Sequence, residues 1–172
     1  MKPENAIAHY KLGKLSSEDI VRLADLWLTQ GLFTDSINLI AMEKTPMMSY
    51  VGPMLENAIG GLELPIPTKV ESAKIVAREV IEKMVSGKMD LMEGANFLYW
   101  DIHHAITDEL PDETYVGTNL GFEHIFCWLR EVWDCRDGSR LLYYTDLPRE
   151  QAEQKFMEHL RQESKKWLEN LA

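Results

Sequence analysis

The sequence predicts an all-α fold, either a single-domain bundle or a stack of helical hairpins with about seven helices. Apolar residues recur every three to four positions along most of the chain. Capping residues and glycines stand at the ends of these periodic segments, and runs typical of strands are scarce. The length of 172 residues predicts one domain over 1–172, large enough to bury a core without disulfides.

The first half of the chain predicts four helices. Ser16 and Thr34 stand where helix N-caps are expected, and the helices after them end at Gly31 and before Pro46. A third helix, around 49–59, is interrupted by a glycine and a proline. The fourth begins with a capping-box spacing at Thr68-Lys69-Val70-Glu71 and runs to about Ser86.

The second half predicts three more helices. One begins at Asp90 and runs to about Leu110, with a core stripe of Leu91, Ala95, Leu98, Ile102, Ala105 and Ile106. Another covers about 118–135, and its stripe is Phe122, Ile125, Phe126, Leu129, Val132 and Trp133. A short extended segment is expected at 141–144. Asp146 is expected to cap the last helix.

The acidic excess is concentrated in one part of the chain. The net charge is −10, and residues 89–137 hold 11 of the 28 acidic residues but two of the 18 basic ones, a net charge of −9. A chain this acidic repels phosphate backbones, which disfavours nucleic-acid binding. The local excess favours a basic protein as partner.

Several acidic and aromatic residues of this segment are predicted to point away from the two core stripes. Carboxylates attract basic partners, and tryptophans are frequent anchors at interfaces. A plain solvated face is the alternative for the acids, and burial in a bundle core is the alternative for Trp100 and Phe97. The predicted partner-binding residues are Trp100, Asp101, His104, Asp108, Glu109, Asp112, Glu113, Glu123, Trp128 and Glu131.

Catalytic and metal chemistry find little support in the sequence. A metal-dependent hydrolase is an alternative function, because four residues of this segment belong to types that bind metals: Asp101, His104, Asp108 and His124. However, the Glu-x-x-His pair of helical metal sites and the zinc spacings are missing. Cys127 stands three residues after His124, but an acidic setting raises a thiol pKa, which argues against a catalytic cysteine. We expect no enzyme activity, no metal and no cofactor.

The cellular setting follows from segments that the sequence lacks. No apolar run approaches the length of a membrane span, and the N-terminal residues lack the apolar core of a secretory signal. Cys127 and Cys135 are too far apart on one helix to form a disulfide. These features predict a cytoplasmic protein with reduced thiols.

The segment over 12–24, LGKLSSEDIVRLA, followed by Gly31 and Asp35-Ser36-Ile37, resembles the N-terminal helical hairpin of small bacterial proteins. Some of these are similar to the immunity proteins of toxin–immunity systems, including contact-dependent growth inhibition. The resemblance covers this hairpin alone and transfers no functional residue. It implies a cytoplasmic protein that binds a cognate toxin, often a basic nuclease, and blocks its active site. A helical scaffold or regulator that binds another basic protein is a further alternative.

Overall fold

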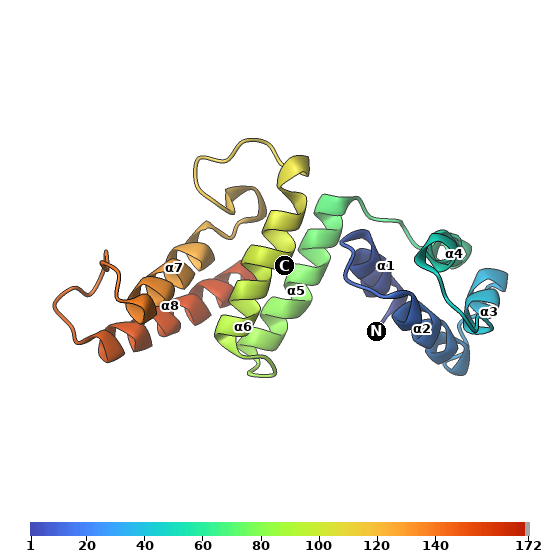
Figure 1. The fold of residues 1–172 in the computed structure, drawn as a ribbon, viewed down its shortest axis with the longest axis horizontal. Coiled ribbons are helices and arrows are strands. Elements are labelled where there is room, and N and C mark those ends of the chain that lie inside the picture. Colours follow the sequence, from blue (N-terminus) through green and yellow to red (C-terminus); the bar gives the residue numbers. More distant parts are fainter. Residues whose placement is uncertain (171–172) are drawn as a thin grey trace. The chain divides into compact units, whose positions relative to one another are not determined.

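The computed structural model describes residues 1–170, and all regular secondary structure in that range is helical (Figure 1). The all-α prediction is therefore confirmed. Contacts divide the chain into two compact units, one covering Met1–Val76 and the other beginning at Ala77. The single domain over 1–172 stays a prediction, and each unit is described by itself. None of the helices in the described range is both long and apolar enough to cross a membrane.

The first unit contains four helices and the start of a fifth. Ser16 and Asp19 form a reciprocal capping box, and the Thr34 hydroxyl accepts a hydrogen bond from the Ile37 backbone N–H, as the sequence predicts. The first helix was not predicted from the sequence, and it has no side-chain cap. The bounds are α1 (Pro3–Lys11), α2 (Ser17–Thr29), α3 (Asp35–Ala41), α4 (Met48–Gly61) and α5 (Lys69–Val85), the last crossing into the second unit.

The core of the first unit forms around Trp27. This side chain is fully buried, and its indole N–H donates a hydrogen bond to the Met1 carbonyl oxygen at 3.0 Å. The apolar side chains packed in the same cluster come from α1, α2, α3 and α4: Ala6, Ile7, Ile20, Ala24, Ile37, Ile40, Val51, Leu55, Ala58 and Ile59. Burial of these apolar stripes is the main source of helix stability.

The predicted helix over 90–110 is present, but it contains three kinds of turn. Asp90 caps it by accepting hydrogen bonds from the backbone N–H groups of Met92 and Glu93. The helix starts as α6 (Leu91–Asn96), widens into a π-helical segment (Phe97–His103) and tightens into a 3₁₀ segment (His104–Glu109). The wide π-helical turn changes which side chains face the core. The predicted core stripe was therefore wrong at Ala105, which is exposed. His103, which was not in the predicted stripe, is buried.

The two last helices, α7 (Glu123–Asp137) and α8 (Arg149–Glu169), pack side by side (Figure 1). The prediction that Asp146 caps the last helix was wrong, because α8 begins after Pro148 without a side-chain cap. The Arg149 guanidinium instead donates hydrogen bonds to carbonyl oxygens at the end of α7, including that of Cys135 at 3.1 Å. This contact holds the start of α8 against the end of α7.

Candidate functional site

A groove of about 600 Å³ lies beside α7 in the second unit. This volume is within the range of ligand-binding pockets. Its walls come from the π-helical segment, the loop before α7, α7 itself and the loop after α7. The apolar lining consists of Tyr99, Tyr115, Val116, Phe126, Trp133 and Leu142. The polar lining consists of Thr114, Glu123, Cys127, Arg130, Glu131, Asp134 and Arg140.

Aromatic rings of the π-helical segment pack directly on those of α7. The ring of Tyr99 makes edge contacts with Phe126 and Trp133, at centroid distances of 5.0 and 5.2 Å. Trp100 stacks on His104 at 5.0 Å and lies 6.1 Å from Trp133. Trp100 nevertheless keeps 58% of its surface exposed, so it is not a core residue. The π-helical segment thus places one tryptophan in water beside the groove.

Large apolar side chains on the two loops are also exposed. Tyr115 is 72% exposed and Leu142 is 73% exposed, and both line the groove. Val116 and Tyr143 are exposed beside them in sequence. We call the groove together with Trp100, Tyr115, Val116 and Leu142 the aromatic groove surface. Contiguous exposed apolar groups of this kind mark interaction sites on soluble proteins.

Glu113 holds the loop that forms one side of the groove. Its carboxylate accepts hydrogen bonds from the backbone N–H groups of Gly117 and Asn119, at 2.9 and 2.7 Å. The same carboxylate lies 2.8 Å from Nε2 of His103. Burial opposes ionisation of Glu113, but these three hydrogen bonds lower its pKa below the ordinary value. The carboxylate of Glu113 is therefore engaged within the chain, with its role in holding this loop.

Glu131 holds the loop on the other side of the groove. The expectation that it points away from the core was wrong, because it is 2% exposed. Its carboxylate accepts hydrogen bonds from the backbone N–H groups of Leu142 and Tyr143. The helical wheel of α7 could not show this, because the loop that covers Glu131 lies beyond the end of the helix. The carboxylate of Glu131 is therefore also engaged within the chain and is not exposed.

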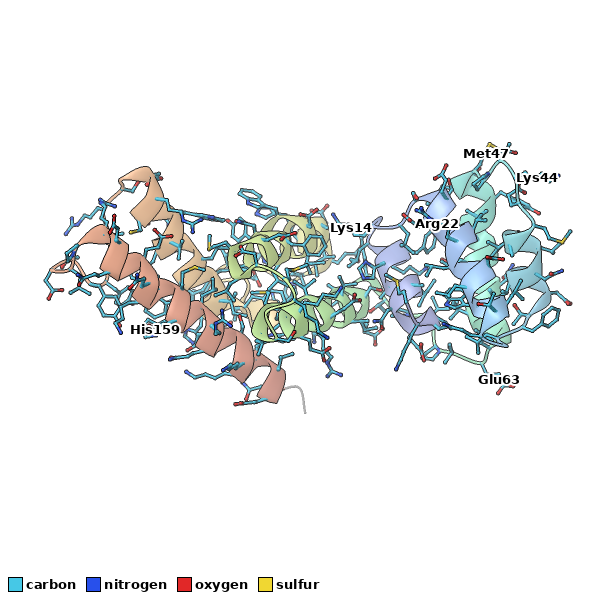
Figure 2. All side chains as sticks on the ribbon, turned by 90° about the horizontal axis from the view of Figure 1, so that it is seen from below. Lys14, Arg22, Lys44, Met47, Glu63 and His159 are labelled. Atoms are coloured by element: carbon cyan, nitrogen blue, oxygen red, sulfur yellow. The ribbon has the colours of Figure 1, made fainter. Side chains whose placement is uncertain are left out.

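Trp128 belongs to a different cluster of rings. It is half-buried and stacks on His159 of α8, labelled in Figure 2, with ring centroids 4.3 Å apart. Tyr144 lies on the loop between α7 and α8, and its backbone is left-handed with φ of 52°. Its hydroxyl lies 2.6 Å from Nε2 of His159. These contacts explain Trp128 as a packing residue between α7 and α8.

The remaining predicted residues lie along the helical run and the loop before α7. His104 is exposed and stacks on Trp100, while Asp101 is half-buried on the π-helical segment. The exposed acids of the predicted set are Asp108, Glu109 and Asp112, at the end of the 3₁₀ segment and in the loop. They add negative charge to the surface of this part of the chain. Tyr115 and Leu142, which are exposed and line the groove, were not predicted, because single apolar loop residues carry no periodic signal.

The groove contains one thiol, that of Cys127. Burial and the nearby Glu131 carboxylate raise the pKa of the Cys127 thiol, as its acidic setting predicted. Cys127 and Cys135 are both unpaired thiols. Over residues 1–170, no three side chains of His, Cys, Asp or Glu gather in a way that could hold a metal ion. Asp101, His104, Asp108 and His124 therefore do not form a ligand set.

Comparison of the chain with family models, with curated proteins and with solved structures finds no match.

Proposed function

We propose that this chain is an immunity-type inhibitor, a binding protein that recognises a basic toxin domain, for example a nuclease, and blocks its active site. The observation that carries the proposal is the exposure of Trp100, Tyr115 and Leu142 around a groove within the acidic part of the chain. Exposed aromatic groups anchor interfaces, and the surrounding carboxylates steer a basic partner towards them.

The acidic residues and the exposed apolar residues have separate roles in this proposal. Asp108, Glu109 and Asp112 attract the partner at long range, which accelerates association. Trp100, Tyr115 and Leu142 lose water on contact, which slows dissociation. The likeness of the segment over 12–24 to immunity-type proteins agrees with such a role. The acids do not need to reach catalytic groups, because a rigid domain seated over the active site excludes the substrate.

Site-specific photo-crosslinking in the native cell tests the proposal. A benzophenone amino acid replaces Tyr115 on the aromatic groove surface, or Phe33 in the first unit as the matched control, since Phe33 is also 63% exposed. We expect position 115 to capture a basic protein that position 33 does not capture. Expression of the captured domain alone should then arrest growth, and co-expression of this chain should restore it. Capture of an acidic protein, or of a basic one that arrests no growth, would contradict the proposal.

A further inference from the structure

An imidazole ring lies directly on the most exposed tryptophan of the second unit's ring cluster. The rings of His104 and Trp100 are stacked, with centroids 5.0 Å apart and planes that meet at 21°. His104 is exposed, and Trp100 keeps 58% of its surface in water. A group that can gain a positive charge therefore touches a residue that the proposed function treats as an interface anchor.

Other rings hold this stack in place. Trp100 also lies 6.1 Å from Trp133 of α7, with the two planes at 28°. The ring of Tyr99 lies 4.7 Å from that of Trp100 and 5.0 Å from that of His104. His104 is thus packed on two aromatic rings of its own helical run, unlike a surface histidine that extends into water. Its position relative to Trp100 is set by these contacts.

A proton on His104 would strengthen its contact with Trp100. Histidine is the side-chain type that changes charge between pH 8 and pH 5. A cation within about 6 Å of the centroid of a tryptophan ring is attracted by the negative face of that ring. The centroid distance of 5.0 Å and the nearly parallel planes meet this condition. Acid should therefore hold Trp100 more firmly in the stack.

The charged and titratable groups on the elements around the stack are mostly acidic. They are Asp101, His103 and Asp108 on the same helical run, Glu113 on the loop before α7, and Arg130 and Asp134 on α7. His103 is buried and has its Nε2 against the Glu113 carboxylate. Carboxylate and guanidinium groups ordinarily keep their charges between pH 8 and pH 5.5. Histidine is therefore the type of group here that changes the local charge in this range.

We propose that His104 makes the aromatic groove surface pH-sensitive, so that the basic partner is bound less tightly as the pH falls from 8 to 5.5. The proton on His104 retains Trp100 in the stack and places a positive charge where a basic protein docks. The partner thus binds the neutral form of His104 more tightly than the protonated form. This inference rests on the proposed function, because it needs a basic partner at Trp100.

The first test needs no partner. The indole N–H signal of Trp100 is followed in the ¹⁵N-labelled full chain from pH 8 to pH 5.5. We expect it to shift together with the ring signals of His104, and His104→Gln should remove the shift. His124→Gln is the matched control, since His124 is exposed on α7 and is not part of the stack. Trp128, which stacks on His159, should behave alike in all three proteins.

The second test measures affinity for the basic domain captured by crosslinking, at pH 8 and at pH 5.5. On this change the native chain and His124→Gln should each lose about five times more affinity than His104→Gln loses. Titration of groups on the partner is common to the three proteins and cancels in this comparison. Circular dichroism at both pH values checks that each variant is folded.

A Trp100 signal that does not shift, or that shifts equally in His104→Gln, would overturn the inference, the second result assigning the effect to His103. Equal losses of affinity in the native chain and His104→Gln would overturn it as well. If crosslinking still captures a basic toxin in those cases, this inference fails alone. Capture of no basic protein from position 115 refutes the proposed function, whatever the Trp100 signal does.

Discussion

Nε2 of His103 lies 2.8 Å from Oε2 of Glu113, and His103 is only 4% exposed. This contact joins the π-helical segment to the loop before α7. The same carboxylate also accepts the backbone N–H groups of Gly117 and Asn119. One acidic side chain thus fixes the position of a whole wall of the groove. The shape of the aromatic groove surface depends on it.

Glu113→Ala should lower the free energy of unfolding by about 2–3 kcal/mol, because it leaves two backbone donors and a buried histidine without their acceptor. Urea unfolding followed by circular dichroism measures the loss. Asp112→Ala, which removes an exposed acid of the same loop, should change the stability by less than about 0.5 kcal/mol. Equal losses for the two variants would mean that the hydrogen bonds of Glu113 contribute nothing.

The lowered pKa of Glu113 predicts a pH dependence of stability. Its pKa is depressed from the ordinary 4.5 in the folded chain. The stabilisation is therefore fully present above the unfolded value and is lost as the pH falls through the lower, folded pKa. The difference in unfolding free energy between the native chain and Glu113→Gln should shrink as the pH falls below 4.5. A difference that stays constant between pH 6 and pH 3 would contradict this assignment.

Alanine substitutions at Gly117 and Gly138 separate two effects on stability, backbone strain and a side-chain clash. Their φ angles are 89° and 88°, so alanine meets the same backbone strain at both positions. A Cβ atom at Gly117 would lie 2.6 Å from the Phe126 ring, whereas at Gly138 it would meet open space among the described residues. Gly138→Ala should cost about 1 kcal/mol, and Gly117→Ala about 1–3 kcal/mol more. Thermal unfolding measures both; equal costs would show that Phe126 moves aside freely.

Charge reversal should act on the rate of association. Asp108→Lys with Asp112→Lys should slow association with the captured partner about tenfold at low salt, with a smaller effect at high salt. Surface plasmon resonance at two ionic strengths measures this. Asp25→Lys with Glu63→Lys, at exposed positions in the first unit (Glu63 is labelled in Figure 2), changes the net charge equally. If both pairs slow association alike, only net charge matters and the acidic segment has no special role.

The sequence predicted local features well. The helix start at Ser16 and the capping box at Thr68 form as expected, because each involves residues three positions apart. Of the aromatic groove surface, the sequence predicted Trp100 but not Tyr115 or Leu142. Glu131 is buried by a loop beyond its own helix, and the π-helical segment rotates His103 into the core. The first outcome depends on a loop outside the helix and the second on a local change of helix type, and a regular helical periodicity describes neither.

The affinity of the captured partner for Trp100→Ala tests the central claim most directly. Trp100 is mostly exposed, so its removal should change stability by less than about 1 kcal/mol while weakening binding by about tenfold or more. Phe33→Ala, the matched control, should bind like the native chain. Calorimetric titration of the three proteins gives the answer. Undiminished binding by Trp100→Ala, or an equal loss in Phe33→Ala, would contradict the assignment of the aromatic groove surface as the binding site.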